Sequence, residues 1–364
     1  MQSILRSTKC QCALRISGLS LVAIGLIGCN GSSGGNSAPP VVINTTTSTL
    51  AGDGVAGTTD GIGAAARFNN PVSVAVDAGG TVYVSDFDND RVRRISPAGV
   101  VDTIVNPTTT PNFQRPFGIA VAPNGTVFVQ TDGDDAGNRN NETGTIWRIN
   151  TATRTATVVA RNLGRPRGLT VLTDGRLVLV DTEHHDVRLL NPAGGIPTLL
   201  AGMRNSRGYT DATGAAARFD RPYGAAVTPQ GDILIADQNN DVLRLVTPGG
   251  VVTTFAGDGM TGFRDGERTQ ARFNRPQDVA IDSAGIVYIS DIGNHRIRRI
   301  DTNGLISTIA GDGTAGFQNG SNLSTKFFAQ EGLDVARNGR IVYVADGNSG
   351  NPDPFNRVRK ITIP

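Results

Sequence analysis

Three histidines are the first candidates for chemistry in this 364-residue chain. His184 and His185 are adjacent, and a pair of imidazoles can contribute to a zinc site. Zinc sites in proteins use three or four protein ligands, and the remaining histidine, His295, belongs to a distant part of the sequence. We therefore expect the histidines to be metal-free. The chain also has no nucleophile elbow, phosphate-binding loop, HExxH motif or cysteine-based site.

Recurring aspartates are the second candidate set, because each ends an apolar run such as VYVSD or VYISD. They are Asp86, Asp181, Asp237, Asp291 and Asp346, and Thr131 takes the same place in a sixth copy of the run. A ring of carboxylates could bind a cation. A residue that recurs in every copy more often has a structural role within that copy, however. We therefore expect each aspartate to cap its own turn or to pair with an arginine in the following run.

Gly- and Asp-rich segments such as GDGMTGFRDGERTQARF are a third set, with some likeness to oxygen-rich calcium loops. They lack the regular acidic spacing and the terminal Glu of an EF-hand loop. Tight turns that need a positive φ explain their glycines more simply. We therefore expect no cofactor, with calcium or zinc as the minor alternative.

All of these residues belong to a repeated unit of four short β-strands. In residues 272–313 the strands read DVAID, IVYIS, RIRRI and LISTIAG, separated by turns rich in Gly, Asn and Asp. The copies begin at Pro71, Pro116, Pro166, Pro222, Pro276 and Gln330. A four-stranded unit that repeats about every 40–50 residues predicts a β-propeller, in which each copy is one blade.

The pattern FN.P..VA.D..G.VY.SD..N.R.R.I, followed by AGDG, resembles the NHL repeat family. The resemblance extends over most of the chain after its N-terminal segment. It implies an all-β, six-bladed β-propeller with four-stranded blades, a narrow axial channel and a binding face at one end. It implies little about activity, because one fold can carry many functions.

The ring is expected to close through the N-terminal strand. The segment TLAGDG at residues 49–54 matches the fourth strands TFAGDG and TIAGDG, whereas the last copy ends at Pro364 without a fourth strand of its own. Residues 47–51 should therefore complete blade six and remove an open sheet edge.

One position differs in chemistry from blade to blade, and we interpret it as the channel mouth. It follows the opening residue of each copy, where Val72 is joined by five candidate ligand-binding residues. They are Phe117, Arg167, Tyr223, Gln277 and Glu331. Asp334 joins this set because it replaces the Ala or Thr of the other inner strands and adds a second carboxylate near the axis.

Two alternatives remain for Glu331. In gluconolactonase-like propellers, a Glu at such an early position helps to hold a catalytic metal, but the matching Asn and Asp ligands are not identified here. Glu331 could instead pair with Arg167 across the ring, and the mouth residues could simply fill the channel.

Long loops are expected on the same face as this mouth. Long Gly- and Asp-rich loops precede blades one, four, five and six, and the loops at residues 132–143 and 346–356 are enlarged. Loops on a rigid scaffold commonly carry function.

The N-terminus reads as an export signal. A basic segment and a short apolar run end in Leu26-Ile27-Gly28-Cys29, which resembles a bacterial lipobox. We expect a signal peptide at residues 1–28, a lipidated Cys29, a flexible tether at 29–46 and the propeller at 47–364. The location is then the cell envelope, at the outer membrane if the cell is Gram-negative.

The composition gives no signal for a polyanionic partner, since the formal net charge is +2. We expect a monomer that binds no nucleic acid, meets the membrane only through its lipid, and binds a protein, peptide or glycan through the loop-rich face. The alternative is a metal-dependent hydrolase or lyase of the gluconolactonase-like or amidating-lyase-like kind. Whether the chain is an enzyme stays open, with a binding role preferred.

Overall fold

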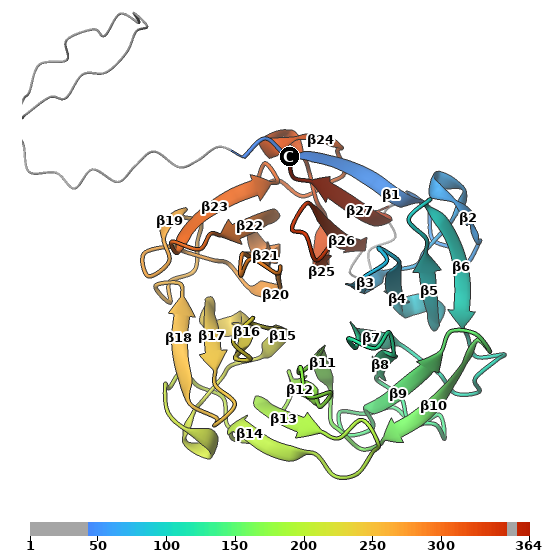
Figure 1. Ribbon diagram of the computed structural model, residues 1–364, viewed down its shortest axis with the longest axis horizontal. Coiled ribbons are helices and arrows are strands. Elements are labelled where there is room, and N and C mark those ends of the chain that lie inside the picture. The colour runs from blue at the N-terminus through green and yellow to red at the C-terminus, as the bar shows by residue number, and fades with distance from the viewer. Residues whose placement is uncertain (1–42, 348–354) are drawn as a thin grey trace, which may run out of the picture. The chain divides into compact units, whose positions relative to one another are not determined.

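The computed structural model describes residues 43–347 and 355–364, which form six antiparallel sheets arranged as blades around an axis (Figure 1). The all-β, six-bladed propeller expected from the repeats is confirmed. The expected signal peptide, Cys29 and most of the tether lie outside the described residues. Within the described part of the chain, no helix is long and apolar enough to cross a membrane.

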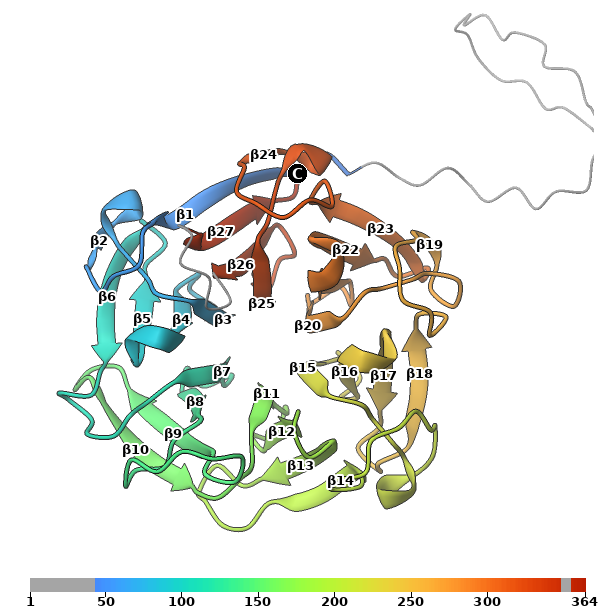
Figure 2. The same ribbon diagram turned by 180° about the vertical axis from the view of Figure 1, so that it is seen from behind.

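The inner strand of every blade lies nearest the axis and contributes its residues to the channel (Figures 1 and 2). These strands are β3 (Pro71–Val76), β7 (Pro116–Val121), β11 (Pro166–Val171), β15 (Pro222–Val227), β20 (Pro276–Ile281) and β25 (Ala329–Val335). Five of them begin at the proline that marks the repeat. A proline is tolerated at the first residue of a strand, where the N–H that it lacks is not needed for the ladder of hydrogen bonds.

The second strands are buried, as their short apolar runs predict, except for Ile341 at the start of the last one. They are β4 (Val82–Asp86), β8 (Val127–Thr131), β12 (Leu177–Asp181), β16 (Ile233–Asp237), β21 (Val287–Asp291) and β26 (Ile341–Gly347). The third strands are β5 (Arg91–Ile95), β9 (Thr145–Asn150), β13 (Asp186–Leu190), β17 (Val242–Val246), β22 (Arg296–Ile300) and β27 (Asn356–Thr362).

The outer strands complete the blades at the rim. They are β6 (Val100–Val105), β10 (Thr155–Ala160), β14 (Thr198–Gly202), β18 (Val252–Ala256), β23 (Leu305–Ala310) and β1 (Thr46–Gly54). As expected, β1 supplies the outer strand of blade six and pairs antiparallel with β27, from Thr46 opposite Thr362 to Gly54 opposite Asn356. The first and last strands of the propeller therefore share one sheet.

The loops that precede blades one, five and six add a short fifth strand, which the repeat pattern did not predict. These strands are β2 (Gly61–Ile62), β19 (Gly266–Glu267) and β24 (Gly320–Ser321), and each pairs with the outer strand of the blade that follows its loop. Single-turn 3-10 helices occur in the loops. They are η1 (Gly63–Ala65), η2 (Phe87–Asn89), η3 (Gly214–Ala216), η4 (Gln238–Asn240), η5 (Ile292–Asn294) and η6 (Asn322–Ser324).

The end of the expected tether already contacts the propeller. The Thr45 side chain is buried and its hydroxyl donates to the carbonyl of Ile309, while its backbone N–H donates to Asn322. The propeller therefore begins before residue 47.

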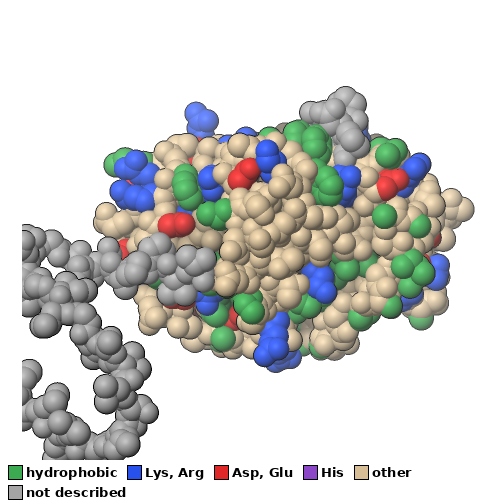
Figure 3. Space-filling model, turned by 90° about the horizontal axis from the view of Figure 1, so that it is seen from above, with side chains coloured by type: hydrophobic (Ala, Val, Ile, Leu, Met, Phe, Trp, Pro, Cys, Tyr) green, Lys and Arg blue, Asp and Glu red, His purple; other side chains and the backbone are tan. Residues whose placement is uncertain are grey.

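Six apolar clusters lie between neighbouring blades and hold the ring together. Five of them contain a fully buried phenylalanine from the loop between two blades, and the sixth contains Leu163. The phenylalanines are Phe68, Phe113, Phe219, Phe273 and Phe327. On the part of the rim seen in Figure 3, basic and acidic side chains are interspersed without a large patch of either sign.

Candidate functional site

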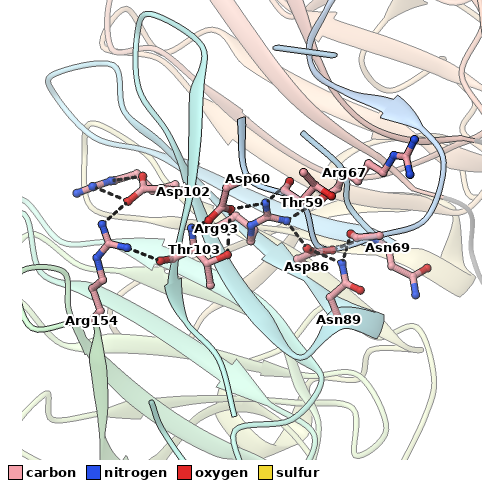
Figure 4. A network of polar contacts seen from close by, with 12 residues as sticks. Thr59, Asp60, Arg67, Asn69, Asp86, Asn89, Arg93, Asp102, Thr103 and Arg154 are labelled. Atoms are coloured by element: carbon pink, nitrogen blue, oxygen red, sulfur yellow. Dashed lines mark hydrogen bonds and ion pairs between the residues drawn. The ribbon is translucent and has the colours of Figure 1, made fainter. Parts of the chain in front are cut away.

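The recurring aspartates are each bound within their own blade. In blade one, the fully buried Asp86 accepts hydrogen bonds from the backbone N–H of Asn69 (2.7 Å), the Asn89 amide (2.8 Å) and Arg93 (2.9 Å) (Figure 4). Burial raises the pKa of Asp86 to about 6, opposed by the nearby charge of Arg93. The carboxylate is therefore ionised at neutral pH and neutralised by a buried arginine.

The same ion pair recurs in four other blades. The pairs are Asp181–Arg188 (2.7 Å), Asp237–Arg244 (2.8 Å), Asp291–Arg298 (2.7 Å) and Asp346–Arg359 (2.7 Å). In blade two, Thr131 accepts a hydrogen bond from the indole N–H of Trp147 at 2.7 Å, so an uncharged pair replaces the ionic one. This geometry agrees with a structural role for the aspartates.

The Gly- and Asp-rich loops use their carboxylates in the same network. Asp60 accepts hydrogen bonds from Arg93 (2.6 Å) and from the backbone and side chain of Thr103, as Figure 4 shows. Asp211 and Asp265 bind Arg244 and Arg298 in the equivalent way. The carboxylate oxygens that gave these loops their likeness to calcium-binding loops thus bind arginine. Among the described residues, no three His, Cys, Asp or Glu side chains are grouped so that they could hold a metal ion.

The adjacent histidines bind different partners instead of converging. His184 is buried between Asp181 (2.8 Å) and Glu142 (3.0 Å), and its hydrogen bond with Asp181 raises its pKa. His185 accepts from the backbone N–H of Arg221 (3.0 Å). His185 and His295 both occupy left-handed turn positions, with φ of 62° and 51°, as their matching places in the repeat implied.

The channel mouth is a cavity of about 260 Å³ lined by all six inner strands. Of the six residues proposed from the sequence, Phe117, Arg167, Tyr223, Glu331 and Asp334 line it. Gln277 lies in an adjoining pocket of about 490 Å³ that shares Tyr223 and Glu331 with the channel. Residues from five different blades therefore line two adjoining pockets.

One side of the mouth is aromatic and carries a buried cation. Phe117 packs edge-on between Phe87 and Tyr223, with ring centroids 5.7 Å and 5.6 Å apart. The guanidinium of Arg167 lies 4.0 Å from the centroid of the Phe117 ring and forms an ion pair with the buried Asp132 at 3.0 Å. The ion pair seen for Arg167 is thus made with the enlarged loop of blade two.

The other side of the mouth is a chain of polar side chains. The Gln238 amide donates to Gln277 (3.1 Å), and Gln277 donates to the carboxylate of Glu331 (3.0 Å). Burial raises the pKa of Tyr223, which lies between the two sides. Asp132, Phe87 and Gln238 were not found from the sequence, because they lie outside the inner strands and only the folded loops bring them to the mouth.

Deeper in the channel, two half-buried carboxylates link neighbouring blades. Asp334 accepts from the backbone N–H of Val76 in blade one (2.8 Å), and Asp278 accepts from that of Leu333 in blade six (2.9 Å). Their depth in the ring raises the pKa of Asp278 to about 7 and that of Asp334 to about 6. Each carboxylate also accepts from the backbone N–H of the residue that follows it, Val279 or Val335, so two bonds orient it.

Sequence reasoning missed Asp278, although a signal for it exists. The third residue of the inner strand is Gly118, Gly168, Gly224 or Gly332 in four blades and Ser73 in blade one. A Cβ added to Gly224 of blade four would lie 1.8 Å from the Asp278 carboxylate, so glycine at this position leaves room for the side chain from blade five. Asp278 is the departure from that rule.

The NHL repeat family model matches two segments of the chain, residues 68–95 and 273–300, which lie in blades one and five. NHL repeat-containing protein 2 of Bos taurus is 30% identical over 164 residues, covering 41% of this chain and 23% of that protein. The chain spans less than a quarter of the length of the curated relatives it matches. The expected NHL resemblance is thus supported in blades one and five.

Solved structures share the fold at low identity. An auxiliary nutrient binding protein from Bacteroides thetaiotaomicron superposes with a TM-score of 0.67 at 17% identity, over 87% of this chain and 76% of that chain. A virginiamycin B lyase from Staphylococcus aureus gives 0.53 at 12%, over 88% and 99%. Similarity at this level shows the architecture alone, and the two neighbours differ in function.

Proposed function

We propose that this NHL-repeat β-propeller is a cell-envelope lipoprotein that binds a ligand at the mouth of its axial channel. The observation that carries the proposal is the mouth itself. Five of the six variable residues line one cavity, whereas the residues that repeat in every blade are used within the blades. Clefts with a few convergent polar groups among aromatic side chains are the usual form of a small-ligand site.

The ligand is proposed to be an exposed part of a protein, peptide or glycan. A cavity of about 260 Å³ holds a side chain or a sugar ring more readily than a folded surface. The adjoining pocket over blades four to six extends the contact area towards the loops. A nutrient binding protein among the structural neighbours is consistent with this use of the fold.

Arrays of glycans and peptides, probed with the purified protein, test the proposal. Tyr223→Ala is expected to abolish binding to the array partner, since Tyr223 is shared by the channel and the adjoining pocket. Arg148→Ala is the control, because Arg148 lines a separate pocket at the turns between the first and second strands, on the opposite face.

Thermal melts of the same variants separate a binding site from a channel plug. If Tyr223 only fills space, Tyr223→Ala should lower the free energy of unfolding by about 2–5 kcal/mol, as core truncations do. Strong destabilisation together with unchanged array binding would contradict the proposal.

The alternative, a metal-dependent hydrolase or lyase, is favoured by one observation. Asp278, Glu331 and Asp334 place three carboxylates along the same cavity, but among the described residues they are not grouped closely enough to hold a metal ion as they stand. Elemental analysis of the purified protein distinguishes the two functions, since that enzyme requires a stoichiometric metal ion.

A further inference from the structure

Arg167 has hydrogen-bonding capacity that the propeller does not use. Its side chain is 9% exposed, and one terminal nitrogen, Nη2, binds Asp132. The other, Nη1, is buried and has no hydrogen-bond partner among the residues that the structure describes. A buried donor without an acceptor is costly because it has lost its hydrogen bonds to water. Among the described arginines, the other buried nitrogens without a partner are Nε atoms, as in Arg93 and Arg244, whereas Arg167 leaves a terminal nitrogen without one.

Tyr223 offers a second donor in the same cavity. Its ring packs on Phe117, whose centroid lies 5.6 Å away, and Phe117 also carries the Arg167 guanidinium. The Tyr223 hydroxyl has no hydrogen-bond partner among the residues that the structure describes. Both side chains line the channel, and the charge of Arg167 acts on the Tyr223 phenol.

We infer that Arg167 Nη1 and the Tyr223 hydroxyl form a subsite for a carboxylate of the bound ligand. The inference rests on the proposed function and names the chemistry that the mouth recognises. A carboxylate accepts several hydrogen bonds at once, and bonds to a charged donor are the stronger kind.

The acidic residues of the cavity favour a carboxylate over a phosphate. Asp132 already neutralises part of the Arg167 charge, and Glu331, Asp278 and Asp334 line the same space. A phosphate dianion would meet more repulsion from these groups than a monoanion does. Glu331 can also accept from a hydroxyl or ammonium group, so the ligand class is a carboxylate that carries such a donor.

The rim of the mouth supplies further cations. Arginine precedes the opening proline in blades two to five, as Arg115, Arg165, Arg221 and Arg275. Arg221 and Arg275 line the adjoining pocket, and the exposed Arg275 forms no ion pair with a described residue. Arg115, Arg165 and Arg221 pair with the carboxylates of Asp88, Asp132 and Glu183. Arg275 is therefore the rim cation that attracts an anionic ligand to the loop-rich face.

Titration with small probes tests the subsite directly. Isothermal titration and thermal melts would use D-glucuronate, glycolate and glycine, with glucose as the neutral probe, inorganic phosphate as the dianion and sodium chloride at matched ionic strength. We expect saturable binding of at least one carboxylate. Tyr223→Phe, which keeps the ring but removes the hydroxyl, should weaken that binding roughly tenfold, the value of one good hydrogen bond.

Arg165→Met is the matched control for Arg167→Met. Both arginines bind Asp132, at 2.9 Å and 3.0 Å, but only Arg167 lines the cavity. Carboxylate binding should be lost in Arg167→Met and kept in Arg165→Met. If Arg167→Met fails to fold, Tyr223→Phe decides alone.

Three results would overturn the subsite. They are glucose binding as tightly as glucuronate, phosphate binding more tightly than any carboxylate, and unchanged affinity in Tyr223→Phe. None of these results contradicts the proposed function if the arrays still show a partner whose binding requires Tyr223. Blank arrays would instead remove the proposed function itself.

Discussion

Each buried aspartate–arginine pair joins three parts of the chain at one point. Arg93 is fully buried against Phe68 and binds Asp86 at the end of β4. It also donates to Asp60 and to two carbonyls of the loop that enters the blade. One side chain therefore fixes a loop that has little regular structure.

Arg93→Met should lower the free energy of unfolding by about 3–5 kcal/mol, because it leaves Asp86 buried without its cation. Arg94→Met is the matched control at the next position. Arg94 pairs with Asp102 at 2.8 Å but is 34% exposed, so its loss should cost about 0.2–1 kcal/mol. Urea unfolding of both variants measures the difference. Equal losses would show that burial of the pair does not set its contribution.

The axial carboxylates predict a pH dependence. An aspartate in an unfolded chain has a pKa of about 3.9, whereas burial raises the pKa of Asp278 to about 7. Because the folded value is the higher one, the stability that Asp278 contributes is complete below about pH 4 and is lost as the pH rises through about 7.

Asp278→Asn removes this titration and keeps an oxygen acceptor for a backbone N–H. Relative to the wild type, the variant should therefore gain stability as the pH rises from about 4 to about 7. Asp174→Asn is the control. Arg176 lowers the pKa of the exposed Asp174, so its replacement should give no such gain in this window. A pH-independent difference for Asp278→Asn would contradict the raised pKa.

At the scale of elements, β1 is the strand on which ring closure depends. It covers the outer edge of β27 and places the fully buried Ala51 in the cluster between blades six and one. Without β1, the long edge of β27 would be free to pair with another chain.

A chain that begins at Gly54 should therefore be less stable than one that begins at residue 43, and should associate. Each lost ladder hydrogen bond contributes about 0.5–1.5 kcal/mol. Thermal melts and light scattering measure both effects. If the shorter chain melts at the same temperature and stays monomeric, β1 does not close the ring in the way its pairing implies.

At the scale of the molecule, stability is distributed around the ring. The apolar clusters lie between blades, and the axis carries a channel instead of a core. All three cysteines, Cys10, Cys12 and Cys29, precede the propeller, so no disulfide can link its blades. A propeller of about 320 residues can be stable without a disulfide, since proteins of this size bury most of the surface that the unfolded chain exposes.

Lipidation of Cys29 is the prediction that belongs to this scale. Cys29→Ser should move the protein from the membrane fraction to a soluble fraction, or leave its N-terminal segment uncleaved. Fractionation and the mass of the mature protein measure the change. Because a single acyl chain gives only marginal anchoring, firm attachment of the wild type requires more than one chain on the cysteine. Unchanged membrane attachment in Cys29→Ser would exclude this anchor.

The sequence by itself determined the architecture, because a propeller is built from local repeats. The blade starts at Pro71 to Pro276, the role of β1 and the pairing of Asp86-type residues with arginine all follow from one pattern read in register. Hairpins join residues that are close in sequence, so their signals are local. Five residues at the variable position line the channel, and their role in binding stays a prediction.

Only the tertiary structure decided how the mouth residues are connected. Arg167 meets Asp132 and Phe87, and Gln277 lies between Gln238 and Glu331, through contacts between different blades. Asp278 and Asp334 cross to the next blade to bind backbone N–H groups that no pattern in their own repeat reveals. Such contacts depend on how far each blade is rotated against its neighbour. That rotation follows from the packing of whole sheets, so a single repeat of the sequence does not contain it.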